Sequence, residues 1–370
     1  MMGSDNIIIL FALNNSGHHV AAIALRKTYN MLYPNKKIIV LNVLESLNPI
    51  VEKIISFLYR LSSYTFPWVW GLLYNNILIY KLCNPLRNLI YKSAAQKLRI
   101  IFEKVKPACI ICTQAIPVGI AGYLKSKYNY PSTIIAVMTD YFPNIYWTDK
   151  YVNYYVVASS EMIDLVSSFG IDKNKIVALG IPIHPVFSQF DRYEDKKISM
   201  PHVLILGGGR GWGGIANFIK QLDTVVHELR LTVVCGTNLK LLKYFEQRNG
   251  KFKKHISIFG QISSEKIKSL LDTSSLIISK AGGLTIAESL ACGVPMVIVN
   301  SLLGQESKNR SFLIKNKAAV EARVGTIADT IKDLLFMNPV NLQRLKNNAS
   351  KLSRPLASFE IVNFVNSLCN

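Results

Sequence analysis

The chain has 370 residues, half of them hydrophobic and 18% charged, which excludes a disordered protein and leaves room for two domains of roughly 150 residues each. Lys and Arg number 43 against 23 Asp and Glu, a formal net charge of +20. This charge favours a polyanionic partner, namely nucleic acid, nucleotide phosphates or an anionic membrane surface. Six cysteines in a chain of this length exclude a disulfide framework, so we expect reduced thiols.

The first half of the chain has the pattern of a doubly wound α/β domain. Residues 7–13 and 38–44 are short apolar runs of strand length, and residues 20–32 between them have helical periodicity. The polar turn Ser16-Gly17-His18-His19 opens that helix. Residues 1–13 lack a basic region and a cleavage site, so we expect no signal peptide. Further strand-like runs lie at residues 108–112, 133–138 and 154–158.

Residues 45–106 combine aromatic side chains with positive charge, nine Lys and Arg against three Glu. Their most apolar part, residues 64–82, contains Pro67 and two asparagines, so we expect a surface helix rather than a membrane span. Such a composition suits the headgroup zone of an anionic bilayer, although buried helices or nucleic acid would also use it. No nucleic-acid-binding motif accompanies it. We predict acceptor or membrane contact for Trp68, Trp70, Tyr74 and Trp147.

The second half repeats the first after a charged linker at residues 191–199. Apolar strand-like runs follow at residues 202–206, 231–235, 256–259, 276–279 and 295–299. We predict two doubly wound, Rossmann-like domains facing a cleft, residues 1–188 and 199–355. The amphipathic tail, residues 356–370, is expected to pack back on the first domain.

Two glycine-rich turns in the second domain each follow a strand and open a helix, where unpaired N–H groups can bind phosphate. The first, GGGRGWGG at residues 207–214, binds phosphate or is simply a flexible turn. The second is SKAGGLTIAE at residues 279–288. Its Thr285 and Glu288 have the spacing of a capping box, but the carboxylate could instead accept two hydrogen bonds from a ribose diol. Spacing leaves both alternatives open.

The motifs GGGRGWGG, SKAGGLTIAESLACGVPMVI and GQESKN, in this order, resemble glycosyltransferase family 28, in particular monogalactosyldiacylglycerol synthases and processive diacylglycerol glucosyltransferases. The first domain agrees, because Asn15-Ser16-Gly17-His18 is similar to the family's glycine turn ending in His. Residues 138–156 resemble its T-D…W…Y-x-V segment, and residues 180–187 its G-I-P-I…F turn. The resemblance runs from about residue 10 to residue 320 and implies the GT-B fold.

The resemblance also implies a UDP-sugar donor site in the second domain. It assigns the diphosphate to Gly282, Gly283 and Thr285, the ribose to Glu288, the hexose to Gln305 and Glu306, uracil to Phe259 and Gly260, and the phosphate side of the cleft to Gly208, Gly209, Arg210 and Gly211. Lys280 belongs to the same donor set. Gln305 and Glu306 could also be merely solvated.

Sugar transfer must neutralise a leaving diphosphate and deprotonate an alcohol. Helix N-termini and glycine amides can do the first, and the chain has no D-x-D cluster, so we predict no metal and no other cofactor. His18 is a candidate base, because an imidazole titrates near neutral pH. The alternative is that His18 only contacts a phosphate or the acceptor. Asp140 is the other candidate, or it caps the following turn.

Three positions on the acceptor side differ from the family pattern. Phe142-Pro143-Asn144 stands where members usually carry a His, Thr113-Gln114 where they often have T-H-P, and Asn153 where an Asp is common. The donor assignment is unaffected by these differences, which concern acceptor identity.

The predicted function is that of a membrane-associated inverting glycosyltransferase. It would move galactose or glucose from a UDP-hexose to diacylglycerol or a related lipid at the cytoplasmic membrane face, with no nucleic-acid partner. The alternatives are transfer to another lipid-linked or polysaccharide acceptor, a catalytically weak UDP-sugar-binding protein, and a UDP-sugar epimerase on the same fold.

Overall fold

The computed structural model describes residues 6–45, 76–189, 200–209, 211, 214–225, 228–248, 250–299, 304–323 and 325–369. Four of the predicted ligand or membrane contacts lie outside this part of the chain: Trp68, Trp70, Tyr74 and Arg210. The predicted linker and most of the apolar segment at residues 64–82 also lie outside it.

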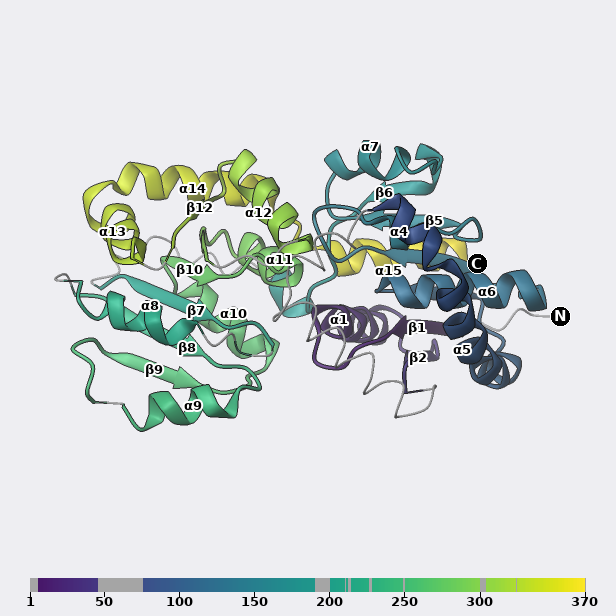
Figure 1. Cartoon of the computed structure of the whole chain (residues 1–370), viewed down its shortest axis with the longest axis horizontal. Coiled ribbons are helices and arrows are strands. Elements are labelled where there is room, and N and C mark those ends of the chain that lie inside the picture. The colour runs from purple at the N-terminus through teal and green to yellow at the C-terminus, as the bar shows by residue number, and fades with distance from the viewer. Residues whose placement is uncertain are drawn as a thin grey trace. The chain divides into compact units, whose positions relative to one another are not determined.

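The chain divides into two compact units. Unit 1 comprises Met1–Pro185, Leu302–Gln305 and Leu356–Asn370, and unit 2 comprises Val186–Ser301 and Glu306–Pro355. Each unit holds one six-stranded sheet with helices around it (Figure 1), and every strand pair described is parallel. The predicted fold class, two doubly wound α/β domains, is confirmed.

The sheet of unit 1 has the strand order β2-β1-β3-β4-β5-β6. Its strands are β1 Ile7–Phe11, β2 Ile38–Asn42, β3 Cys109–Cys112, β4 Thr133–Val137, β5 Tyr154–Val157 and β6 Ile176–Ala178. All of β1 is buried, because it lies inside the sheet and both of its faces are covered, which is why its sequence is uniformly apolar rather than alternating. In register, Ile7 lies opposite Ile38 on one side and Cys109 on the other.

The helices of unit 1 are α1 Gly17–Leu32, α4 Ile77–Leu82, α5 Asn84–Val105, α6 Ala115–Tyr128, α7 Glu161–Ser167 and α15 Ala357–Leu368. Short 3-10 turns are η2 Ile145–Trp147, η3 Lys173–Lys175 and, at the boundary, η4 Pro185–Ser188. Helix α1 begins where the Ser16 hydroxyl accepts a hydrogen bond from the His19 amide, which satisfies one of the free N–H groups of the first turn.

The C-terminal helix α15 packs on α1 within unit 1. Its residues Ile361, Val362 and Val365 share a fully buried cluster with Ile7 and Ile9 of β1. A disulfide joins Cys109, the first residue of β3, to Cys369, directly after α15. The expectation that all thiols are reduced is therefore wrong for this pair. The sequence could not indicate it, because the two cysteines are 260 residues apart and only the return of α15 brings them together.

The sheet of unit 2 has the order β12-β11-β10-β7-β8-β9. Its strands are β7 His202–Leu206, β8 Arg230–Val234, β9 Ile256–Phe259, β10 Leu276–Ser279, β11 Met296–Ile298 and β12 Ala319–Glu321. Its helices are α8 Ile215–Leu222, α9 Leu239–Glu246, α10 Ser264–Asp272, α11 Gly283–Ala291, α12 Gln305–Lys315, α13 Ile327–Lys332, the π-helix η5 Asp333–Met337 and α14 Pro339–Leu352. Helix α8 buries Ile215, Phe218, Ile219 and Leu222, a single apolar stripe, in the core of the unit.

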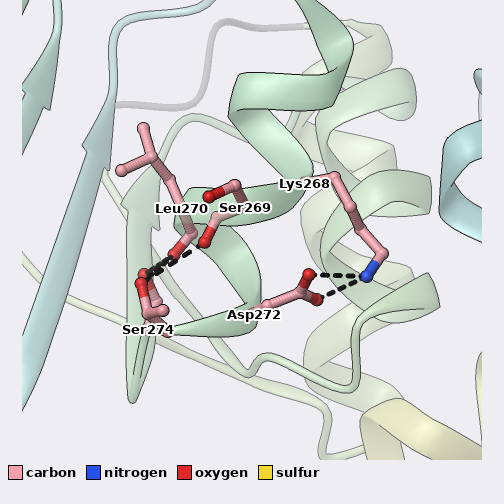
Figure 2. A network of polar contacts seen from close by, with 6 residues as sticks. Lys268, Ser269, Leu270, Asp272 and Ser274 are labelled. Carbon is pink, nitrogen blue, oxygen red and sulfur yellow. Dashed lines mark hydrogen bonds and ion pairs between the residues drawn. The ribbon is translucent and has the colours of Figure 1, made fainter. Parts of the chain in front are cut away.

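Figure 2 shows polar contacts of helix α10 and of the residues that connect it to β10. On α10, the Lys268 ammonium donates to both carboxylate oxygens of Asp272 at 2.6 Å, with both side chains largely buried. Just before β10, the Ser274 hydroxyl donates to the Leu270 carbonyl at 2.6 Å and lies 3.3 Å from Nδ1 of His202 at the start of β7. This edge of the sheet is therefore fixed by side chains that satisfy one another.

Helices α4 and α5 of unit 1 leave large apolar side chains in solvent. Leu78 and Leu82 on α4 are 78% and 80% exposed, and Leu86 and Leu89 on α5 are 62% and 65% exposed. Leu78 and Leu82 are four residues apart on α4, and Leu86 and Leu89 are three residues apart on α5, so each pair lies on one side of its own helix. Among the described residues, no helix combines the length and apolar character needed to cross a bilayer.

Candidate active site

The strand orders fix where a ligand is expected in each unit. In a doubly wound sheet, ligands bind at the carboxyl ends of the two strands between which the order reverses. In unit 1 these strands are β1 and β3, and in unit 2 they are β7 and β10. The predicted base His18 follows β1, and the two glycine turns follow β7 and β10. The sequence-predicted residues thus gather at the two places where this topology binds ligands.

His18 lies in the first turn of α1 and is held by two oxygens. Its Nδ1 atom is 2.9 Å from the carbonyl oxygen of Thr113, directly after β3, and 2.7 Å from the hydroxyl of Thr139, two residues after β4. The Thr113 hydroxyl in turn donates to the His18 carbonyl at 3.0 Å. Gln114 accepts a hydrogen bond from the Ala12 amide and so fixes the chain as it leaves β1. Three strands therefore contribute to the position of one imidazole.

Burial lowers the pKa of His18 to about 4, and the hydrogen bond to the Thr113 carbonyl offsets this only in part. Above that pH the ring is neutral, so one ring nitrogen carries a lone pair and can take a proton. The residue keeps part of its surface exposed. An imidazole in this state can serve as a base without first losing a proton of its own.

Asp140 and Trp147 lie beyond β4. Asp140 follows Thr139 and is 9% exposed. Trp147 ends the turn η2 and is 5% exposed. The structure places Trp147 in the interior rather than on the surface, so of the two roles predicted for it only contact with an acceptor stays a prediction.

The first glycine turn of unit 2 packs against the loop after β8. Gly211 has a φ of +61°, and a methyl group there would overlap the Cys235 carbonyl oxygen. The Thr237 amide donates to the Gly209 carbonyl at 3.1 Å, and the Asn238 side chain donates to the Gly211 carbonyl at 2.9 Å. Backbone packing alone thus requires glycine at position 211, whatever ligand the turn binds.

The second glycine turn is different. Gly282 is the N-cap of α11 with an ordinary φ of −76°, and the nearest atom to a methyl group there would be the Thr285 hydroxyl at 3.9 Å. Neither backbone nor packing requires glycine at this position, whereas a ligand on the helix N-terminus would. Gly283 is the first residue of the helix, and no side chain caps it. The capping-box alternative for Thr285 and Glu288 is therefore wrong.

Glu288 is 8% exposed on α11. Burial raises the pKa of its carboxyl to about 8. No hydrogen bond from another described residue to this carboxylate offsets the cost of burying its charge. The carboxyl is therefore mostly protonated at neutral pH, and hydrogen-bond donors placed against it would favour its charged form.

Lys280 links the two loops at this corner. Its ammonium donates to the Glu306 carboxylate at 2.7 Å, and its Cε atom lies 3.5 Å from where a methyl group on Gly208 would stand. Helix α12 begins at Gln305, and the fully buried Asn309 on it donates to the Ala281 carbonyl at 3.1 Å. The start of α12 is thus tied to the turn after β10 by an ion pair and a hydrogen bond.

The two residues predicted to meet uracil end an outer strand of the sheet. Phe259 is the last residue of β9, and its carbonyl oxygen accepts a hydrogen bond from the Cys235 amide at 2.8 Å. Gly260 follows it, and a methyl group there would lie 3.3 Å from Leu242. Both stand at the carboxyl edge of the sheet, and their contact with a base stays a prediction.

The sequence did not single out Thr113, Thr139 or Asn309 as site residues. Each is a buried polar side chain: Thr113 directly follows β3, Thr139 lies two residues after β4, and Asn309 is the fifth residue of α12. That position was the available signal, since buried polar groups at a carboxyl edge need a partner. Their partners are more than twenty residues away along the chain, so the sequence could not name them.

Comparison with known proteins adds to this geometry. Residues 18–183 match the model of monogalactosyldiacylglycerol (MGDG) synthase, and residues 202–357 match that of the glycosyltransferase family 28 C-terminal domain. The chain belongs to glycosyltransferase family 28. The predicted resemblance is thereby confirmed, and with it the enzyme class, glycosyl transfer.

Among the relatives of this family 28 chain, a processive diacylglycerol beta-glucosyltransferase of Bacillus cereus (strain AH187) is 26% identical over 377 residues, 99% of this chain and 94% of the relative. The solved structure of Acinetobacter baumannii MurG matches with a TM-score of 0.64 at 15% identity, over 98% of this chain and 99% of that one. UDP-GlcNAc 2-epimerase from Neisseria meningitidis matches with a TM-score of 0.59 at 12% identity, over 97% and 99%. These structures establish the GT-B fold and do not separate transferase from epimerase.

Proposed function

We propose that this enzyme transfers a hexose, galactose or glucose, from a UDP-sugar to diacylglycerol or a related lipid, with inversion at the sugar carbon and at the surface of an anionic membrane. The match of residues 18–183 to the MGDG synthase model and the glucosyltransferase relative support the acceptor class. The donor side rests on the geometry of unit 2.

The buried carboxyl of Glu288 is the observation that carries the donor proposal. Two hydroxyls of a ribose would supply the donors that the described residues do not, and they would stabilise the charged form. Gly282 leaves the N-terminus of α11 open for a diphosphate, and Lys280, whose ammonium is ion-paired with Glu306, precedes it by two residues. A helix N-terminus and a cation stabilise the charge that develops on the leaving diphosphate, so the transfer proposed here uses no metal.

On the acceptor side, neutral His18 accepts the proton of the lipid hydroxyl as that oxygen attacks the sugar. The imidazole is held by oxygens from β3 and β4 and needs no conformational change to accept a proton. Asp140 remains the second candidate for this role.

The exposed leucines of α4 and α5 form the surface proposed to dock on the membrane: Leu78, Leu82, Leu86 and Leu89. Exposed cations on the same helices, Lys81 and Lys92, complement an anionic bilayer. The guanidinium of Arg87 stacks 3.6 Å from the Tyr80 ring, which contacts the Tyr146 ring in η2 at 5.1 Å. The docking helices are thereby joined to the segment after β4 that carries Asp140.

Incubation with UDP-glucose or UDP-galactose and diacylglycerol in anionic liposomes tests the proposal, with mass spectrometry of the extracted lipids as the readout. A monohexosyl lipid from one of the donors is expected. UDP binding without any glycolipid would overturn the transferase proposal and leave a UDP-sugar-binding protein. A new sugar epimer formed from the donor alone would identify an epimerase.

Calorimetry with UDP in buffer containing a chelator tests the donor site separately. We expect binding of wild-type protein and a loss of about tenfold or more for Glu288→Gln, since the amide presents one acceptor oxygen instead of a charged pair. Absence of UDP binding to the wild-type chain under these conditions would contradict the metal-independent donor site.

Flotation with liposomes tests the docking surface. The double variant Leu78→Glu and Leu82→Glu is expected to lose association with anionic vesicles, because two negative charges replace the two most exposed of the four leucines. The control is Leu239→Glu on α9 in unit 2, where a leucine 66% exposed lies outside the surface. Equal flotation of the double variant and the control would rule out docking through α4.

A further inference from the structure

One nitrogen of His18 faces two oxygens. The Thr113 carbonyl and the Thr139 hydroxyl lie 2.9 Å and 2.7 Å from Nδ1. Thr139 is 4% exposed, and the contact with His18 is the hydrogen bond that its side chain makes among the described residues. A buried hydroxyl placed against an imidazole nitrogen has an effect on the ring that depends on where the proton sits.

The carbonyl decides the position of that proton. A carbonyl oxygen can only accept a hydrogen bond, so Nδ1 must carry the hydrogen for the 2.9 Å contact to be favourable. The Thr139 hydroxyl then accepts a share of the same N–H in a three-centre hydrogen bond, an arrangement that is common in proteins. With the proton on Nδ1 in the neutral ring, the lone pair is on Nε2.

Two acceptors in different directions also fix the plane of the ring. A single hydrogen bond to the Thr113 carbonyl would let the imidazole rotate about that contact, whereas a second oxygen from another strand limits the rotation. Thr113 and Thr139 follow β3 and β4, which are neighbours in the sheet. The sheet therefore sets the distance between the two oxygens.

We infer that Thr139 is a positioning residue, which together with the Thr113 carbonyl fixes the Nδ1–H tautomer and the ring plane of His18, so that Nε2 is the atom that takes the proton of the acceptor. The inference rests on the proposed function. In the step, the O–H bond of the acceptor alcohol breaks and its proton moves to Nε2. The oxygen forms a bond to the sugar carbon, and the bond from that carbon to the diphosphate breaks, its electron pair leaving with UDP.

The test compares Thr139→Val, Thr139→Ser and a matched control, Thr28→Val. Thr28 is a fully buried threonine on α1, the helix of His18, and its hydroxyl donates to the Ala24 carbonyl one turn earlier. For Thr139→Val we expect kcat to fall about five- to tenfold, the size of one lost hydrogen bond, with KM for the donor unchanged. Thr139→Ser restores the oxygen and is expected to stay within about twofold of wild type. Thr28→Val is expected to leave kcat unchanged.

Ring ¹⁵N spectra, with the His18 signals assigned by their loss in His18→Gln, supply a readout that a structural role would not move. Wild type is expected to show His18 as the neutral Nδ1–H tautomer from pH 6 to pH 8, and Thr139→Val to show a mixture of tautomers. The acid limb of the kcat/KM profile, near pH 4 in wild type, is expected to move downward in Thr139→Val, because the valine methyl group replaces an oxygen that accepts from Nδ1–H and so stabilises the charged ring.

Three results would overturn the inference. The first is an Nε2–H tautomer in wild type. The second is a Thr139→Val protein with unchanged kcat and tautomer, and the third is a loss of kcat in Thr139→Val that comes with an equal loss in Thr28→Val and a lowered melting temperature in both. If wild type makes no glycolipid, the proposed function fails, while the ring spectra still decide the inference about the tautomer.

Discussion

The candidate sites of the two units lie at the same place in the sheet topology, the carboxyl ends of β1 and β3 (the β1–β3 corner) and of β7 and β10 (the β7–β10 corner). They are made of different kinds of groups. At the β1–β3 corner of unit 1, one hydroxyl and one carbonyl, from residues that follow β4 and β3, hold one imidazole, His18. At the β7–β10 corner of unit 2, glycine backbone and a helix N-terminus form the surface, and the carboxyl of Glu288 is buried without a described partner. In unit 1 the imidazole is hydrogen-bonded within the protein, whereas in unit 2 the proposed function assigns the missing donors to a ligand.

This difference fits the two tasks of a glycosyltransferase. A proton acceptor must be fixed to within a fraction of an ångström, and dense hydrogen bonding around the ring achieves that. A nucleotide must enter and leave, and the proposed donor site would serve this with amides that glycine leaves accessible and with an acid whose charged form the bound ribose would stabilise. Substitutions at the His18 site should therefore lower kcat, and substitutions at the proposed donor site should lower UDP affinity.

Replacing the imidazole should give the largest effect. His18→Gln is expected to lower kcat about a thousandfold, the usual contribution of a positioned base, while UDP affinity measured by calorimetry stays at the wild-type value. The neighbouring His19, which stacks on Phe11 at 4.4 Å, provides the control His19→Gln, for which kcat should change little. A wild-type kcat in His18→Gln would show that His18 is not the base and would leave Asp140 as the candidate.

The Lys268–Asp272 ion pair on α10 should contribute to the stability of unit 2 and not to activity. Asp272→Asn leaves the buried Lys268 ammonium without its ion pair and should lower the free energy of unfolding by about 3 kcal/mol. The Arg99–Glu103 pair has the same i, i+4 spacing on α5 but lies half exposed, so Glu103→Gln should cost less than about 0.5 kcal/mol. Urea unfolding of both variants measures this. Equal losses would mean that burial does not set the strength of the Lys268–Asp272 pair.

Substitutions at Gly211 and Gly282 distinguish a requirement for glycine in packing from a requirement for glycine in ligand binding. Gly211→Ala should lower stability by about 2 kcal/mol, because it places a side chain at positive φ and against the Cys235 carbonyl. Gly282→Ala should keep wild-type stability and lose about tenfold in UDP affinity, since its surroundings are open to a methyl group and only a ligand would meet it. Thermal unfolding and calorimetry on both proteins test this, and unchanged UDP affinity in Gly282→Ala would place the diphosphate elsewhere.

A further expected effect is a pH dependence of UDP binding. The pKa of Glu288 is raised to about 8 in the free protein, so the carboxyl is mostly protonated at pH 7. Ribose hydroxyls favour the carboxylate, so binding should release about one proton and affinity should rise from pH 6 to pH 8, by at most tenfold per unit. Calorimetry in buffers of different ionisation enthalpy measures the proton. The proton release that comes from the Glu288 carboxyl should be absent in Glu288→Gln, which distinguishes it from the ionisation of UDP itself. An equal proton release in both proteins would contradict the assignment of the ribose to Glu288.

The sequence by itself determined the fold class and the candidate corners. Uniformly apolar runs of strand length are typical of strands buried on both faces, and glycine turns after such strands indicate the edge where ligands bind. His18 and the glycine motifs were found because these signals are local, each contained in about ten neighbouring residues. The motif resemblance gave the family for the same reason.

Only the tertiary structure decided which groups meet. It paired His18 with Thr113 and Thr139, joined Cys109 to Cys369, buried Trp147, and replaced the capping box of Thr285 and Glu288 with a glycine N-cap. It also showed that Gly211 is required by packing and Gly282 is not. Each of these depends on contacts between distant parts of the chain or on the exact backbone angle at one residue. Hydrogen bonds and burial act over a few ångströms in space, and residue spacing along a chain does not record those distances.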